Sequence, residues 1–240
     1  MGISLAPDEI ALRMNLVHIA DGAMASYACG HITTKESKAI VADLDAVLGD
    51  HIFRFHPGVA YRHVLVVKGH PEILGLEFTP PHDISDKPVA GQKPRGVGAE
   101  ILTRLMERAR EVLASSPANR ERASRGLLPA TDIWPFWPGV APSGLTPFTE
   151  LRGVRAAMTS GVDLLNGLAV LFGIDRLSIA GVTDGADNDY AAQVEGALAA
   201  LRDHDLVIVH RVNTDVPGRQ VTAEECGQLV KPIFEARTGQ

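Results

Sequence analysis

Residues 11–20 read ALRMNLVHIA, and their character alternates along the chain. The apolar side of this stretch is formed by Leu12, Met14 and Leu16. Arg13 and Asn15 fall between them, on the other side. Because successive side chains of a β-strand point to opposite faces, the pattern predicts a strand with one buried face. The following Asp21-Gly22 favours a tight turn, which predicts a hairpin into residues 23–28.

The chain then continues as a mixture of helices and strands. Thr33 and Glu36 have the spacing of a capping box, which predicts the start of a helix that ends at Gly49. Two further strands are predicted over 51–56 and 61–68, with a Pro57-Gly58 turn between them. These strands would be antiparallel, so the first half of the chain is predicted to be α+β.

A long loop and a long helix follow. Residues 77–98 are rich in Pro, Asp and Gly, and long loops inside compact domains are often functional. An amphipathic helix is predicted behind the loop. Its apolar stripe contains Val97, Ile101, Leu102, Leu105, Met106, Ala109, Val112 and Leu113.

The second half has a different pattern. Residues 135–147 are rich in proline and predict a junction between two domains. Trp134, Phe136 and Trp137 lie at its start, where they would either form a platform for a ligand or be buried at the junction. Beyond it, strands are predicted over 154–158, 177–180 and 206–209, and helices over 162–172 and 190–202. The alternation predicts a thin α/β sheet with parallel strands.

The predicted fold is therefore mixed α/β and α+β. Its domains are residues 1–134, a junction over 135–147, and residues 148–240.

The composition excludes several classes of protein. The 240 residues are 45% hydrophobic and carry a net charge of −6, with no basic stripe for nucleic acid and no apolar run for a membrane. The two cysteines, Cys29 and Cys226, form no disulfide framework, and no signal peptide is evident, so a cytoplasmic protein is expected.

Several short blocks stand in an order that resembles a known family, the archaeal-type cofactor-independent phosphoglycerate mutases of the alkaline phosphatase superfamily. The blocks are 12–17 (LRMNLV), 30–36 (GHITTKE), 57–66 (PGVAYRHVLV), 81–83 (PHD), 119–122 (NRER), 125–130 (RGLLPA), 161–165 (GVDLL) and 181–184 (GVTD). Each block alone is weakly specific, but their common order covers most of the chain. The resemblance implies a substrate-closing inserted α+β domain, followed by a reduced phosphatase-like α/β sheet.

The resemblance also implies a two-metal centre and a serine that takes the phosphoryl group, and the chain departs from both. It opens at Met1 at a point well inside the family pattern, so a truncated, divergent relative is expected. Asp215 stands where the family has a metal-binding aspartate, but Arg219 replaces the expected histidine. Because an arginine does not ligate metals, we expect no metal and no cofactor.

The resemblance and the side-chain chemistry together define a candidate site. Its catalytic members would be His82 and Asp83, since an imidazole beside a carboxylate can move protons near neutral pH. Its substrate-binding members would be Arg13, Arg62, Asn119, Arg122 and Arg125, since arginines pair well with phosphate and carboxylate. Without the resemblance, each of these residues would be assigned to the solvent-exposed face of a strand, to an exposed run of charged residues or to a turn in a loop. Ser143 and Ser160 carry hydroxyls that could be nucleophiles, but the sequence assigns no base that would activate either one.

The expected function is a metal-independent reaction of the lyase or isomerase type. Its substrate would be a small phosphorylated, phosphonate or carboxylate molecule. Two alternatives stay open: a ligand-binding protein without turnover, and one subunit of a split mutase-like enzyme. The thin second sheet predicts a homodimer, or a second chain that completes the core.

Overall fold

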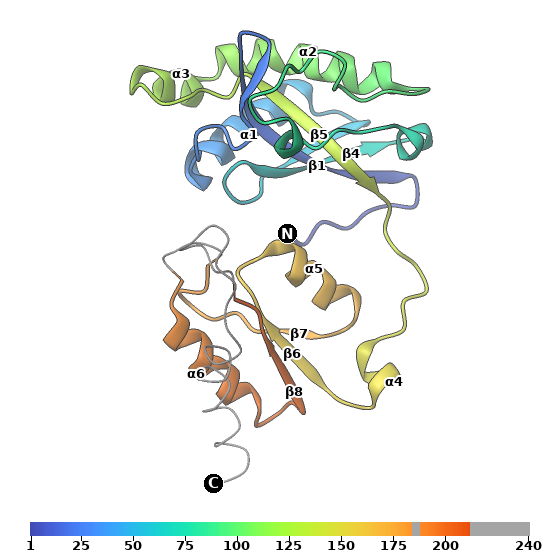
Figure 1. The fold of residues 1–240 in the computed structure, drawn as a ribbon. Coiled ribbons are helices and arrows are strands. Elements are labelled where there is room, and N and C mark those ends of the chain that lie inside the picture. The colour runs from blue at the N-terminus through green and yellow to red at the C-terminus, as the bar shows by residue number, and fades with distance from the viewer. Residues whose placement is uncertain (184–187, 212–240) are drawn as a thin grey trace. The chain divides into compact units, whose positions relative to one another are not determined.

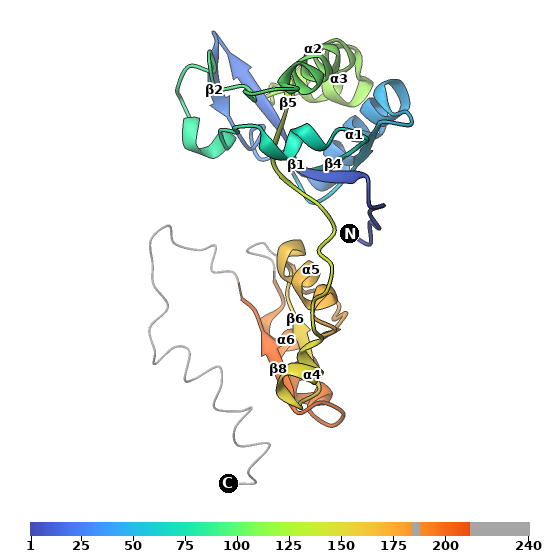
Figure 2. The same cartoon turned by 90° about the vertical axis from the view of Figure 1, so that its right-hand side faces the viewer.

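The computed structural model describes residues 1–183 and 188–211. The chain forms two compact units, with the boundary between Ala141 and Pro142 (Figures 1 and 2). The first unit contains an antiparallel sheet and the second a parallel one, so the predicted mixture of α+β and α/β structure is confirmed. The features predicted around Asp215 and Arg219, and Cys226, lie outside the described residues.

The first unit is built around one long strand, β1 (Glu9–Ala20). Its other elements are β2 (Ala23–Ser26), α1 (Thr34–Leu48), β3 (Phe53–His56), β4 (Arg62–Lys68), η1 (Pro71–Gly75), η2 (Pro81–Ile84), α2 (Ala99–Ser115), α3 (Pro117–Ser124) and β5 (Asp132–Gly139). The strands are ordered β2-β1-β4-β3, and β5 also pairs with β1. The strand predicted over 11–20 and the hairpin that follows it are confirmed.

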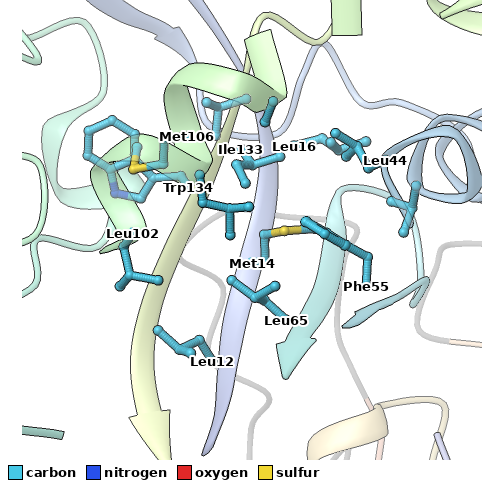
Figure 3. Close-up of a cluster of buried hydrophobic side chains, with 14 of the residues drawn as sticks. Leu12, Met14, Leu16, Leu44, Phe55, Leu65, Leu102, Met106, Ile133 and Trp134 are labelled. Carbon is cyan, nitrogen blue, oxygen red and sulfur yellow. The ribbon is translucent and has the colours of Figure 1, made fainter. Parts of the chain in front are cut away.

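The alternation in β1 decides which face is buried. Its apolar side chains lie opposite Leu65 of β4 and Ile133 of β5 in the strand register, and they pack against α1 and α2 (Figure 3). Labelled members of this core are Leu12, Met14, Leu16, Leu44, Phe55, Leu65, Leu102, Met106 and Ile133. All are nearly inaccessible to solvent, so burial of apolar surface holds this unit together.

The start of α1 has the predicted capping box. The Thr33 hydroxyl accepts a hydrogen bond from the Glu36 backbone N–H, and the Glu36 carboxylate accepts one from the Thr33 backbone N–H. The helix ends at Gly49, but the backbone there is extended rather than left-handed. Glycine is required for space, because a Cβ at this position would lie 2.3 Å from the Asp45 carbonyl oxygen.

The segment predicted as a junction is partly a strand. β5 runs to Gly139, although it contains Pro135 and Pro138. Among the described residues, β5 is bonded only to β1. Prolines are tolerated on such edge strands because the missing N–H is not needed there. The first unit therefore extends further along the chain than the predicted boundary at residue 134.

The second unit is a small α/β structure. Its described elements are α4 (Phe148–Arg152), β6 (Ala156–Thr159), α5 (Asp163–Leu171), β7 (Asp175–Arg176), α6 (Tyr190–Ala200) and β8 (Leu206–Val209). The strands are parallel in the order β7-β6-β8. The strand over 206–209 is confirmed. The strand predicted over 177–180 is wrong, because pairing with β6 ends at Arg176 and only the Leu177 N–H continues it, to the Met158 carbonyl.

Within the described residues, no helix is both long and apolar enough to cross a membrane.

Candidate functional site

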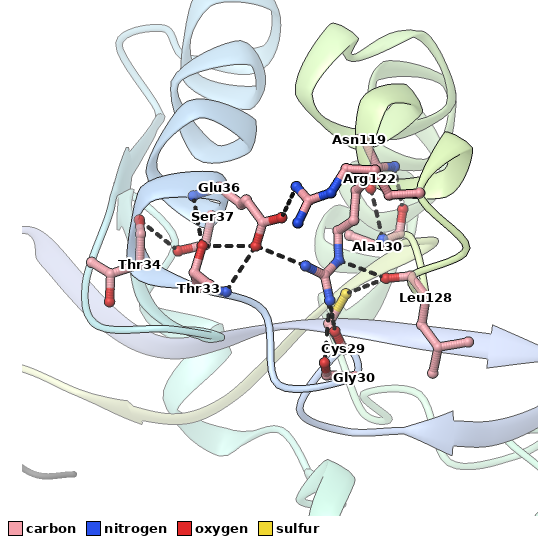
Figure 4. Close-up of polar contacts among 11 residues, drawn as sticks. Cys29, Gly30, Thr33, Thr34, Glu36, Ser37, Asn119, Arg122, Leu128 and Ala130 are labelled. Atoms are coloured by element: carbon pink, nitrogen blue, oxygen red, sulfur yellow. Dashed lines mark hydrogen bonds and ion pairs between the residues drawn. The ribbon is translucent and has the colours of Figure 1, made fainter. Parts of the chain in front are cut away.

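The structure divides the predicted site residues into two groups. Arg13, Arg62 and His82 lie with a set of aromatic rings on the first sheet. Asn119, Arg122 and Arg125 lie on α3 or just after it, and the two arginines meet Glu36 of α1 (Figure 4). The two groups differ in what their polar atoms contact.

The two arginines of the first group share one face of the sheet. Arg13 is paired with Val64 of β4, and Asn15 is paired with Arg62. Residues two apart on a strand point to the same side, so Arg13 and Arg62 are diagonal neighbours. This face is opposite to the apolar side of β1, so the alternation that builds the core also sets the two cations side by side.

Aromatic rings surround these cations. The Arg13 guanidinium lies 5.2 Å from the centre of the Phe136 ring and 5.7 Å from that of Trp137. The Arg62 guanidinium lies 5.2 Å from the Tyr61 ring. Such cation–π contacts hold a guanidinium in place without using its N–H donors. These contacts thus fix the position of the Arg13 guanidinium and leave its N–H donors for a ligand.

Arg13 is a partly buried cation without an acidic partner among the residues that the structure describes. Its Nε is buried and has no hydrogen-bond partner there. Burial lowers the pKa of the Arg13 guanidinium, the Tyr61 hydroxyl raises it, and the charge of Arg62 lowers it. A bound anion would offset both the burial and the repulsion between the two arginines.

His82 joins the same group through its ring contacts. It lies in η2, and its imidazole makes edge contacts with the rings of Tyr27, Phe136 and Trp137, at 6.3, 6.2 and 5.7 Å between centres. Its Nε2 is 3.7 Å from the Asp83 carboxylate, and 39% of the His82 side chain is exposed. The imidazole is therefore reachable from solvent and shares the rings of Phe136 and Trp137 with Arg13, as an acid–base group in a small site could.

Arg122 has a different environment. Its side chain is only 2% exposed, and its N–H groups donate to other residues of the chain. Nε donates to the Leu128 carbonyl at 2.8 Å, one Nη to the Glu36 carboxylate at 2.7 Å, and the other Nη to the carbonyls of Cys29 and Gly30 at 3.0 and 3.2 Å (Figure 4). Arg122 thus ties α3 to α1 and to two loops.

The groups around Arg122 respond to its charge. Burial alone would raise the pKa of the Glu36 carboxyl, but the hydrogen bonds from Thr33 and the charge of Arg122 outweigh it and lower that pKa. Burial raises the pKa of the Cys29 thiol to about 11, against the opposing effect of Arg122. Cys29 therefore stays protonated, and its thiol faces the Leu128 carbonyl at 3.6 Å.

Asn119 is also used by the fold. Its amide nitrogen donates to the carbonyls of Leu113 and Ala130, and its oxygen accepts from the Ala130 N–H, all at 2.8 Å (Figure 4). Arg125 is the member of this group that is open to solvent, and it contacts Glu36 at 3.2 Å. A ligand contact by any of these three residues stays a prediction.

The second unit supplies one polar pair that the sequence did not reveal. The Ser160 hydroxyl lies 3.0 Å from Nδ1 of His210 and accepts a hydrogen bond from the Val162 N–H. The two residues directly follow β6 and β8, and the carboxyl ends of adjacent parallel strands meet at one edge of a sheet. Their positions after two predicted parallel strands were the signal available in the sequence.

The described residues contain no group of side chains that could bind the metals implied by the family resemblance. No three His, Cys, Asp or Glu side chains converge there as a metal would require. The described side chains thus do not fit a two-metal centre.

Comparisons with known proteins agree with the resemblance. The sequence profile described as 2,3-bisphosphoglycerate-independent phosphoglycerate mutase matches residues 1–119. An enzyme of that name from Methanothrix thermoacetophila is 43% identical over 97% of this chain and 57% of its own length. Another from Methanosarcina mazei is 37% identical over 98% of this chain and 61% of its own length. The chain thus spans about 60% of the length of these relatives.

Solved structures support the fold. A protein from Pyrococcus horikoshii matches with a TM-score of 0.66 and 22% identity, over 98% of this chain and 55% of its own. The cofactor-independent phosphoglycerate mutase of Thermoplasma acidophilum matches with a TM-score of 0.58 and 24% identity, over 98% and 61%.

Proposed function

Because the chain is a divergent relative of the archaeal-type 2,3-bisphosphoglycerate-independent phosphoglycerate mutases, we propose that it binds a small phosphorylated or carboxylated anion through Arg13, Arg62 and His82. One observation carries this proposal. Arg13 is a partly buried cation, held by two aromatic rings, with no acidic partner in the described residues. A phosphate or carboxylate would supply that partner.

The two units would have different roles in this function. The first unit would correspond to the substrate-closing domain of the family, and the second to a reduced phosphatase-like core. The names of the relatives suggest phosphoglycerate as the ligand to test first. His82 is the proposed proton donor or acceptor, because its imidazole is adjacent to Arg13's aromatic neighbours and open to solvent.

Replacing Arg13 with alanine should weaken binding of 3-phosphoglycerate by about 10- to 100-fold, because a hydrogen bond to a charged group contributes about 1.5–3 kcal/mol. Isothermal titration calorimetry on the purified chain measures this. Arg104→Ala is the matched control, since it removes the same charge from an exposed position on α2 and should leave the affinity unchanged.

Arg125→Ala decides between the two groups of arginines. If 3-phosphoglycerate binding is lost in Arg125→Ala and retained in Arg13→Ala, the ligand lies near α3 and the present assignment is wrong.

Turnover is tested separately from binding. We expect a metal-independent reaction of the lyase or isomerase type, in which His82 moves a proton of a small phosphorylated or carboxylated substrate. This conversion should persist in EDTA and be lost in His82→Gln, because glutamine cannot titrate. Binding without conversion would favour a non-catalytic protein. Conversion only after addition of a second chain would favour the split-enzyme alternative.

A further inference from the structure

Trp137 has an unusual backbone conformation. Its φ is +49°, in the left-handed region that bulky side chains rarely occupy. It also precedes Pro138, and the residue before a proline normally adopts an extended conformation. Strain of this kind persists only where the surrounding structure imposes it, and it is concentrated at functional sites.

The cause of the strain is a β-bulge. Arg13 is paired with Phe136 and Leu12 with Pro138, so Trp137 is an extra residue without a partner on β1. In a regular strand, Phe136 and Trp137 would point to opposite faces. Here their ring centres are only 4.9 Å apart. The bulge therefore turns Trp137 onto the face that carries Arg13.

In this position the Trp137 ring contacts two members of the proposed site. It lies 5.7 Å from the Arg13 guanidinium and 5.7 Å from the His82 ring. Trp137 as a whole residue is still 55% exposed, unlike Trp134 and Phe136, which are fully buried. A ring recruited only for core packing would not leave half its surface in solvent.

We infer that Trp137 is a positioning residue, which the bulge places so that its ring fixes the Arg13 guanidinium and the His82 imidazole for anion binding. The inference rests on the proposed function, because it concerns the same site. It adds that the strained backbone is retained for binding rather than for stability. Trp137 acts mainly through Arg13, by restricting the side-chain rotamers that the guanidinium can adopt.

Substitution of Trp137 separates binding from stability. Glycine accepts a positive φ without strain, so Trp137→Gly should melt within about 3 °C of the wild type. Its affinity for 3-phosphoglycerate should nevertheless fall about tenfold, because the cation–π contact is lost. Trp137→Asn, which also tolerates this conformation, serves as a second variant should the glycine loosen β5. Trp137→Phe restores an aromatic face and should bind within about threefold of the wild type.

A double-mutant cycle tests whether Trp137 affects ligand affinity through Arg13. In an Arg13→Ala background, Trp137→Gly should change the affinity little, because the residue through which it acts is gone. Equal losses in both backgrounds would overturn the positioning role, as would wild-type affinity in Trp137→Gly. These outcomes are distinct from failure of the proposed function itself, in which the wild-type chain would not bind 3-phosphoglycerate at all.

Discussion

Replacing Arg122 with alanine is expected to lower the free energy of unfolding of the first unit by about 3–5 kcal/mol, because several buried hydrogen bonds from one charged group are lost and each contributes about 1.5–3 kcal/mol. The substitution removes the donors for the Glu36 carboxylate and for the carbonyls of Leu128, Cys29 and Gly30. Urea denaturation followed by circular dichroism measures the loss.

Arg125→Ala is the matched control. Arg125 contacts the other oxygen of the same Glu36 carboxylate at 3.2 Å, but its side chain is 57% exposed. Exposed ion pairs contribute at most about 1 kcal/mol, so this variant should stay close to the wild type. Similar, small losses in both variants would mean that the buried contacts of Arg122 are dispensable.

Acidification is expected to destabilise the first unit through His63. Burial lowers the pKa of the His63 imidazole to about 3, and its Nδ1 accepts a hydrogen bond from the Gly58 N–H. Between pH 6.5 and this value, the unfolded chain binds a proton that the folded chain does not. Stability therefore falls as the pH falls, by about 1.4 kcal/mol for each unit, or about 3 kcal/mol between pH 6.5 and 4.

His63→Asn isolates this contribution. An asparagine oxygen can take the place of Nδ1 as acceptor for Gly58, but the side chain does not titrate. The slope of unfolding free energy against pH over this range should flatten in His63→Asn. It should persist in the control His51→Asn, which removes an exposed imidazole. An unchanged slope in His63→Asn would show that other groups cause the acid sensitivity.

The sequence predicted the elements whose signals are local. The alternation of β1 and the capping box at Thr33 depend on residues close together in the chain, and both are present in the structure. The strand β5 was missed because its prolines indicate a loop, and only pairing with β1 shows that they are tolerated. The helix α3 was missed because its charged composition has little amphipathic pattern.

The candidate site was predicted in part. Arg13, Arg62 and His82 were named from the resemblance, and the strand register brings the two arginines together. Tyr27 was not assigned to the site, and Trp137 was left between a platform for a ligand and burial at a junction, because their positions depend on long-range contacts and on a bulge that no local pattern encodes. Asn119 and Arg122 were chosen for their chemistry, which equally suits a buried polar network.

The place of β1 in the sheet has a consequence for how the chain acquires its structure. β1 is near the start of the sequence, yet one of its edges is completed by β5, at the end of the first unit. Pairings so distant along the chain close a long loop, which slows folding. On the ribosome, this edge of β1 would remain open until β5 has been synthesised, and binding by chaperones or self-association would compete with folding during that interval.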